Sequence, residues 1–323
     1  MTRNKRLFIR TILGDIDPGE IGLTYCHEHV IIDESYPSLL NPLFLLNDVD
    51  KISRELSEFY DTGGRTLVDA MPANCGRNAA KLADISRNTK VNIIASTGMH
   101  LEKYYLPGHW RYSYSAGMLT RLFIDDINTG IDRYDYGGPL VDRTPYRAGL
   151  IKVATGNDKI TTHQEKIFDA VVSAHLETGA PILTHTNAGT LAYEQVDLFA
   201  RLGTDLSHVM ISHTDRIGDI DYHRGLLEKG ITLEYDAAFR WKKDEENITL
   251  RLLESLLPDF PDQIVAGMDM AKNSYWNSYG GQPGINYLML DFTEEMKKRG
   301  LEDYLDRLFC STPARLFSFG IKN

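Results

Sequence analysis

The 323-residue sequence predicts an α/β protein built as a (β/α)8 barrel, the TIM-barrel architecture. Short apolar runs typical of β-strands occur eight times, and amphipathic segments of helical length separate most of them. Strand and helix in eightfold alternation favour a closed parallel barrel. An open doubly wound sheet is the alternative, but no glycine-rich dinucleotide-binding motif follows the first strand.

The predicted strands are short stretches rich in aliphatic and β-branched residues. They cover residues 22–32, 65–71, 91–97, 149–155, 180–186, 208–214, 231–237 and 263–269. The predicted helices cover residues 48–62, 76–89, 159–179, 190–202, 218–229, 244–257 and 284–298. Because no linker or low-complexity tract interrupts this order, we expect one domain over residues 1–323.

Three segments depart from the alternation. Residues 1–21, which contain FIRTILGDIDPGEIG, are predicted to form a small hairpin that leads into the barrel. Residues 101–147 separate the third and fourth strands and are rich in Tyr, Arg, Asp and Gly. An insertion of this length is usually functional, and we expect it to carry a short helix. Residues 270–283 form a polar, aromatic loop directly after the eighth strand.

Bulk properties narrow the class of protein. The formal net charge of −10 does not favour a nucleic acid or an anionic membrane as partner. The sequence contains no run of about 18 apolar residues, so no membrane span is expected. The three cysteines are widely spaced and form no CxxC pair, which suits a reducing compartment, so we expect a cytoplasmic protein.

A His-x-His pair lies in the first predicted strand, within TYCHEHVII. Alternation in a strand points His27 and His29 to one side and Cys26, Glu28 and Val30 to the other. Two imidazoles aimed into a barrel are suitable ligands for zinc. The alternative is a chance pair, since the chain has ten histidines.

Lys152 lies in the fourth predicted strand between two apolar residues, in AGLIKVAT. Burial of an ammonium group is costly, so an inward-facing lysine loses its proton or gains a partner. A neutral amine can react with carbon dioxide to give an anionic carbamate that bridges two metals. The alternative is an outward-facing lysine whose stem runs past a helix.

Three more candidates end later strands: His185 in PILTHTN, His213 in VMISHTD and Asp269 in IVAGMD. Each alone has a plain alternative, a hydrogen-bonded rim histidine or an aspartate that caps a helix. Together with the earlier three residues they fall on strands one, four, five, six and eight, toward the ends where barrel active sites lie. This order predicts a site for two divalent metal ions at the C-terminal end of the barrel.

The ordered motifs resemble those of the phosphotriesterase family of the amidohydrolase superfamily. The resemblance runs from RTILGDIDPGEIGLTYCHEHV through RAGLIKVAT, LTHT, ISHTD and AGMD to STPARLF. It implies a (β/α)8 barrel with two metals, usually zinc, although Mn, Co or Fe fit the same ligands. It also implies that His27, His29 and Asp269 bind the more buried metal and that His185 and His213 bind the more exposed one. Carboxylated Lys152 would bridge the two together with a hydroxide, and relatives of this kind are commonly homodimers.

Such a site implies hydrolysis of an ester by attack of the bridging hydroxide, with Asp269 as the catalytic proton acceptor. We expect a lactonase that opens a sugar lactone. The alternatives are a phosphotriesterase, phosphodiesterase or aryl-esterase and, more distantly, a non-catalytic metal-binding barrel. The resemblance implies that many lactonase relatives carry a tyrosine where this chain has His100, and the nearby Tyr104 and Tyr105 are candidates to replace it.

Cationic residues follow the last three strands in a chain that is acidic overall. Barrel enzymes often bind phosphate at the loops after strands seven and eight, so we expect a small-molecule substrate that carries a phosphate group. The candidate substrate-binding residues after these strands are Arg216, Lys242, Lys243, Lys272 and Tyr275, in addition to His100 and Tyr104. The alternative is a set of solvated loop charges paired with Asp244, Glu245 and Glu246.

Overall fold

The computed structural model describes residues 7–241 and 246–320. Eight parallel strands surround its centre and pair in chain order, each with the next. They are β3 (Leu23–Glu28), β4 (Gly64–Asp69), β5 (Asn92–Gly98), β6 (Leu150–Ala154), β7 (Ile182–His185), β8 (Val209–Ser212), β9 (Thr232–Tyr235) and β10 (Ile264–Ala266). These strands confirm the predicted (β/α)8 barrel and all eight predicted strand positions.

The barrel closes between its last and first strands through loop contacts. The backbone N–H groups of Met268 and Asp269, just beyond β10, donate to the carbonyl oxygen of His27 in β3, at 3.3 and 2.8 Å. The three-residue strand β10 itself pairs with β9. The ring is therefore completed at the C-terminal end of the strands, beside two of the predicted metal ligands.

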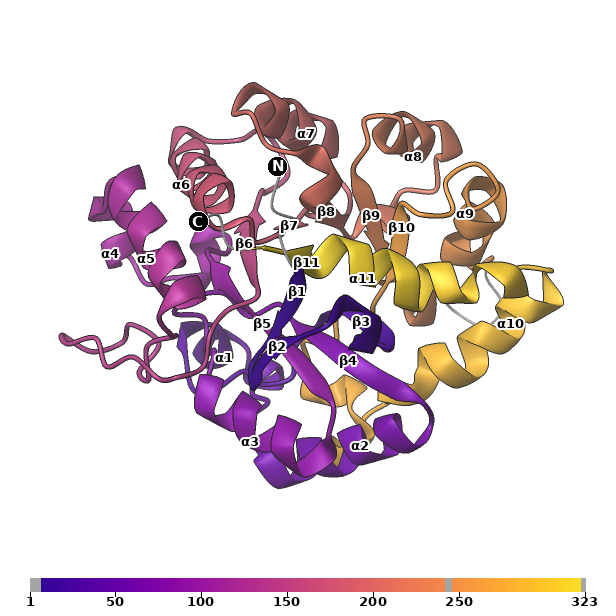
Figure 1. The fold of residues 1–323 in the computed structure, drawn as a ribbon, viewed down its shortest axis with the longest axis horizontal. Coiled ribbons are helices and arrows are strands. Elements are labelled where there is room, and N and C mark those ends of the chain that lie inside the picture. Colours follow the sequence, from indigo (N-terminus) through magenta and orange to yellow (C-terminus); the bar gives the residue numbers. More distant parts are fainter. Residues whose placement is uncertain (1–6, 242–245, 321–323) are drawn as a thin grey trace, which may run out of the picture.

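Helices form an outer layer around the strands (Figure 1). They are α1 (Tyr36–Leu40), α2 (Val49–Asp61), α3 (Ala79–Thr89), α4 (Trp110–Ser113), α5 (Ala116–Asn128), α6 (Thr162–Thr178), α7 (Ala192–Arg201), α8 (Ile220–Leu227), α9 (Ile248–Leu256), α10 (Thr293–Lys298) and α11 (Thr312–Phe317). None of the described helices combines the length and apolar character needed to cross a membrane.

Helix boundaries follow local capping. The predicted segment 76–89 becomes helical only at Ala79, because the side chain of Asn78 caps the helix by accepting from the N–H of Lys81. The predicted helix 284–298 is divided into a 3-10 turn, a π-helical stretch (Leu288–Phe292) and α10. The segment between β5 and β6 holds α4 and the thirteen-residue α5, which packs against α6.

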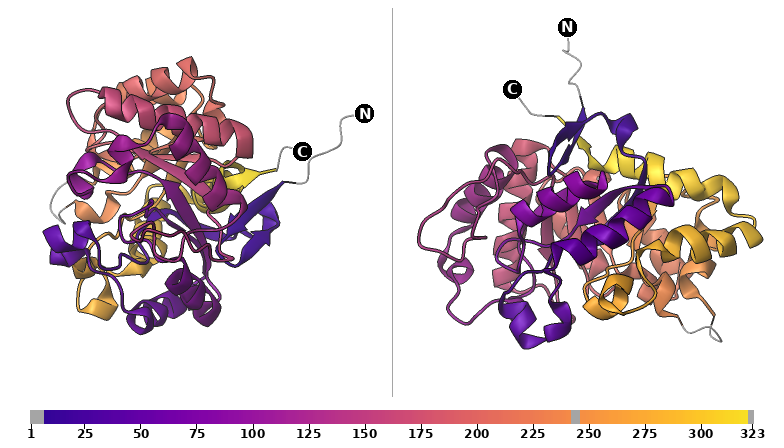
Figure 2. Two further views of the ribbon diagram at one scale, coloured as in Figure 1. Left: turned by 90° about the vertical axis from the view of Figure 1, so that its left-hand side faces the viewer. Right: turned by 90° about the horizontal axis from the view of Figure 1, so that it is seen from below.

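A small antiparallel sheet lies at one end of the barrel (Figure 2). Strand β1 (Phe8–Thr11) pairs with β2 (Gly14–Ile16) on one side and with β11 (Ser318–Phe319) on the other. Ile9 of β1 and Leu316 of α11 join the apolar cluster inside the barrel. This sheet closes the N-terminal end of the strands and leaves the opposite end open for a site.

Strand β3 departs from strict alternation. Its pairing with β4 shifts register between Tyr25 and Glu28. As a result Cys26 packs inside the barrel with Val68 and Ile94, whereas alternation predicts that it points away from the interior. That prediction for Cys26 is wrong, because the irregular pairing turns neighbouring residues toward the same side.

Candidate metal centre

The six predicted ligands meet at the C-terminal end of the barrel, next to a cavity of about 230 Å³. The cavity is lined by five of them: His27, His29, Lys152, His185 and Asp269. The sixth, His213, lies against His185, with its Nε2 atom 2.8 Å from His185 Nδ1. The structure therefore brings together residues from strands far apart in the sequence.

One group of donors consists of two imidazoles and a carboxylate. Oδ1 of Asp269 lies 3.2 Å from Nε2 of His29 and 3.9 Å from Nε2 of His27. The three residues have the spacing of a metal-ligand set. Two nitrogens and one oxygen that converge in this way are typical ligands of a catalytic zinc, which keeps a further position open.

The backbone around Asp269 forms a turn that places its side chain at the site. Asp269 adopts a left-handed conformation with φ of +48°, which is unfavourable for a non-glycine residue. The buried carboxylate of Glu28 accepts hydrogen bonds from the N–H groups on both sides of it, Met268 at 2.7 Å and Met270 at 3.2 Å. Glu28 thus stabilises the turn that presents Asp269. The sequence analysis missed this role, although an acidic residue between two histidines of a buried strand was the available signal.

The second group consists of His185 and His213. Nδ1 of His213 forms a short hydrogen bond with the carboxylate of Asp236, and Arg216 pairs with the other oxygen of that carboxylate at 3.3 Å. His213 and Arg216 hold the pKa of Asp236 far below its usual value, so it accepts and His213 Nδ1 donates. This leaves a lone pair on His213 Nε2, directed at His185, as in histidines that bind metals.

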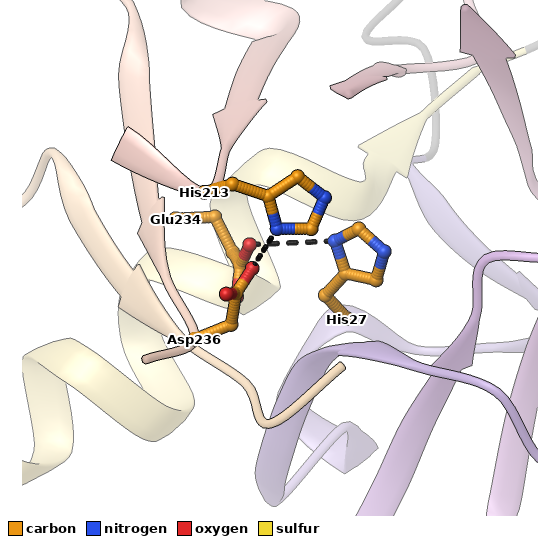
Figure 3. Close-up of side chains that lie close together, drawn as sticks. All are labelled: His27, His213, Glu234 and Asp236. Atoms are coloured by element: carbon orange, nitrogen blue, oxygen red, sulfur yellow. Dashed lines mark hydrogen bonds and ion pairs between the residues drawn. The ribbon is translucent and has the colours of Figure 1, made fainter. Parts of the chain in front are cut away.

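Acidic side chains lie beside two of the imidazoles, Glu234 near His27 and Asp236 near His213 (Figure 3). Nδ1 of His27 lies 3.0 Å from Ser212 Oγ and 3.4 Å from Oε2 of Glu234. His27, His213, Glu234 and Asp236 have ligand spacing of their own. Asp236 is hydrogen-bonded to His213, and we interpret it as a support for that ligand. The oxygens of Glu234 make no hydrogen bond with a described residue, so its role is proximity to His27 alone. The sequence analysis missed both acids of ITLEYDA.

Lys152 is fully buried and points into the site. Its Nζ atom lies 3.3 Å from Nε2 of His27, which excludes the outward-facing alternative. Burial lowers the pKa of Lys152 to about 8, so the neutral amine is accessible near neutral pH. Only the neutral amine reacts with carbon dioxide, and the surroundings of Lys152 therefore suit a carbamate.

The donor set fits divalent cations. Burial lowers the pKa of His27 and of His185 well below the usual value, so both rings are neutral and carry a lone pair. Nε2 of His185 is buried and has no hydrogen-bond partner among the residues that the structure describes. Neutral imidazoles beside an ionised carboxylate and a reactive lysine are ligands suited to zinc and to similar metals.

The predicted substrate-binding residues lie around the same cavity. It is lined by His100, Tyr104, Arg216, Lys272 and Tyr275, whereas Lys242 and Lys243 fall outside the described residues. Arg216 is engaged in ion pairs, since its Nη2 also lies 3.5 Å from Asp269 Oδ2. Arg240 lines the cavity too, and its Nη2 contacts the same oxygen at 3.1 Å.

Three lysines line the cavity, and Lys152 belongs to the ligand set; the other two, Lys272 and Lys103, form no ion pair within residues 7–241 and 246–320. Nζ of Lys272 lies 5.7 Å from the ring centre of Tyr275, and Nζ of Lys103 lies 5.1 Å from that of Tyr104. Lys103 was missed in the sequence analysis, because nothing in the insertion distinguishes it from a solvated surface lysine. These two ammonium groups are the cations best placed to receive an anionic ligand.

The loop after β10 is fastened to helix α2 by a buried glutamate. Glu55 is 2% exposed and accepts three backbone N–H groups. Its Oε1 contacts the amides of Asn277 at 3.2 Å and Ile285 at 3.0 Å, and its Oε2 that of Ser278 at 2.7 Å. One buried side chain of α2 thus anchors the C-terminal part of the loop that carries Lys272.

Replacing Glu55 with glutamine should loosen this loop. The amide NH2 group would face backbone donors, so we expect the free energy of unfolding to fall by about 1.5–3 kcal/mol. Urea unfolding measures that loss, and hydrogen exchange should be faster at residues 277, 278 and 285. Glu58→Gln, an exposed change on the same helix, should shift stability by about 0.5 kcal/mol or less. Unchanged exchange at the three amides would contradict the assignment.

The barrel and its converging ligands define a metal-dependent hydrolase of the amidohydrolase type. The sequence profile of the phosphotriesterase family matches residues 8–317, and the chain therefore belongs to the phosphotriesterase family. This is a family of enzymes with two metal ions. The match confirms the resemblance found in the sequence motifs.

Several known proteins are similar over nearly the whole chain. A phospho-furanose lactonase from Mycoplasmopsis agalactiae is 29% identical, over 98% of this chain and 92% of its own. The crystal structure of an amidohydrolase from Mycoplasma synoviae matches with a TM-score of 0.91 at 28% identity, covering 98% of this chain and 94% of that one. The crystal structure of a lactonase from Listeria monocytogenes matches with a TM-score of 0.88 at 30% identity, covering 98% of this chain and 100% of that one.

Proposed function

We propose that the protein is a metal-dependent lactonase that opens a phosphorylated sugar lactone. The observation that carries this proposal is the position of Lys103 and Lys272, neither of which forms an ion pair with a described residue, beside the cavity that the candidate metal ligands line. The similarity to proteins named phospho-furanose lactonase and lactonase supports the reaction and the phosphate group.

We assign His27, His29 and Asp269 to one metal and His185 and His213 to the other. Lys152, as a carbamate, would bridge the two. Zinc is the expected metal, and Mn, Co or Fe suit the same donors. Bound cations would supply an activated water and polarise the ester carbonyl group.

The protein's own residues then orient the reactants and move the proton. Asp269 is the proton acceptor, and the pairing of its Oδ2 with Arg240 and Arg216 directs Oδ1 toward the histidines. Arg216 is therefore engaged with carboxylates, and we assign the phosphate mainly to Lys272 and Lys103. The hydroxyl of Tyr275, which Arg240 contacts at 3.1 Å, is a further donor at this end of the cavity.

Substrate turnover and metal content test the proposal. Purified protein should contain about two metal ions per chain, lose activity to a chelator and regain it with zinc. The protein is assayed on a panel of sugar lactones, with and without a phosphate group, and hydrolysis is measured as the release of acid. Paraoxon and aryl esters in the same panel test the alternative hydrolases. The homodimer and the cytoplasmic location stay predictions, and light scattering after size exclusion tests the first.

Replacing Lys272 with alanine should raise KM for the phosphorylated lactone by about tenfold, since it removes one charge-assisted contact. KM for the unphosphorylated lactone should stay nearly unchanged, because that substrate never makes the contact. Lys229→Ala removes the same charge from an exposed position that precedes β9 at the other end of the barrel, and should affect neither. Equal rates on both lactones in the unmutated protein would remove the case for a phosphate site.

A further inference from the structure

His100 lies at the cavity without being one of the candidate metal ligands. It follows β5, and its ring centre lies 4.9 Å from that of His185 and 4.4 Å from that of Tyr104. A side chain so close to a candidate ligand can contact whatever ester reaches the metals. Its hydrogen bonds determine what kind of contact it can make.

The polar groups of His100 other than Nε2 already have partners. Its backbone N–H donates to the hydroxyl of Tyr105 at 2.9 Å, and its carbonyl oxygen accepts from Arg111 Nη1 at 2.8 Å. Its Nδ1 accepts from the backbone N–H of Leu101, at 2.8 Å. Among the described residues, no hydrogen bond is made by Nε2.

The bond from Leu101 fixes the tautomer of the ring. A backbone N–H can only donate, so Nδ1 must present its lone pair, and the proton of the neutral ring is on Nε2. The remaining ring nitrogen is therefore an N–H donor without a lone pair. In this tautomer Nε2 has no lone pair to offer a metal, although the ring lies beside His185.

Residues of the insertion between β5 and β6 fix the backbone of His100. Arg111 of helix α4 is 1% exposed, and its guanidinium lies 4.3 Å from the ring centre of Tyr105. The Tyr105 hydroxyl in turn donates to the carbonyl oxygen of Ala73 at 3.1 Å. The backbone of His100 is thereby clamped on both sides. A donor fixed before the reaction needs no reorganisation as charge develops on a substrate oxygen.

We infer that Nε2–H of His100 donates a hydrogen bond to the ester carbonyl oxygen of the substrate, where negative charge develops during hydrolysis. This inference rests on the proposed function. It assigns the insertion a chemical task, which is to hold one neutral donor over the reacting group. A contact with a sugar hydroxyl instead would change KM and depend on which hydroxyls the lactone carries.

The first test needs no substrate. Nitrogen-15 NMR of histidine-labelled protein, with the His100 signal assigned by its loss in His100→Gln, should show a protonated Nε2 and an unprotonated Nδ1. A ring protonated on Nδ1 would overturn the inference whatever the enzyme hydrolyses.

The second test is kinetic. His100→Phe should lower kcat by about 10²–10³-fold, the usual effect of losing one such donor. His100→Gln, whose amide N–H reaches a similar position, should recover much of that loss. His208→Phe changes a histidine that precedes β8, at the other end of the barrel, and should leave kcat near normal. Full kcat in His100→Phe, or a change in KM alone, would refute the donor.

The two failures are distinguishable. If the unmutated protein cleaves no lactone, the proposed function fails, and the same variants are compared on whichever ester of the panel it does cleave. If it cleaves lactones but His100→Phe keeps full kcat, the inference fails alone.

Discussion

Replacing Lys152 with alanine should abolish metal binding and hydrolysis together. The methyl group cannot form a carbamate, so the proposed bridge between the two ligand groups would be lost. The Nζ position beside His27 would become an empty polar space. We expect metal content, measured by plasma mass spectrometry, to fall from about two ions per chain to less than one, with kcat at the detection limit.

Chemical rescue provides the matching control for Lys152→Ala. A short carboxylic acid such as acetate or propionate fits the vacated space and supplies two oxygens, so it should restore part of the metal content and activity. Lys159→Ala, at an exposed position, should behave like the unmutated protein. Two bound metals together with an unmodified Lys152 amine, seen in a crystal structure, would contradict the carbamate.

Replacing Asp269 with asparagine should lower kcat by about 10²-fold or more, the usual worth of a general acid–base group. The amide keeps an oxygen for the metal but accepts no proton. Metal content should therefore fall less than in Lys152→Ala, and this contrast separates the two roles. Asp303→Asn, an exposed change, serves as the control. Near-normal turnover in Asp269→Asn would reassign the proton transfer to another group.

The barrel was predictable because its signal is local and repeated. Each strand is a short apolar run, and the candidate ligands are polar residues within such a run or directly after it, as Lys152 is in the middle of β6. The facing of Cys26 was not predictable, because it depends on a register shift between two strands. The division of the helix at 284–298 was likewise not predictable, because apolar spacing does not distinguish a π-helical stretch from an α-helix.

The residues that support the site could not be predicted from the sequence, for a different reason. Glu28, Glu55 and Asp236 act on residues that are distant in the chain or on another element. A pattern shows that an acid sits in a buried segment, but only the fold shows which amide or imidazole it faces. The same holds for His100, whose tautomer is set by the next residue and whose orientation is set by an arginine eleven positions away.

The contacts that close the barrel involve residues of the candidate metal site. Strand β10 joins β3 through the carbonyl oxygen of His27, the amide of Asp269 and the carboxylate of Glu28. Two of these three residues are candidate metal ligands, so the closure of the ring and the convergence of the ligands depend on the same residues. Stability and metal occupancy are then thermodynamically linked. Without bound metal, we expect local unfolding to begin at the β10–β3 junction. Amide hydrogen exchange should then be faster there than in β5, β6 and β7.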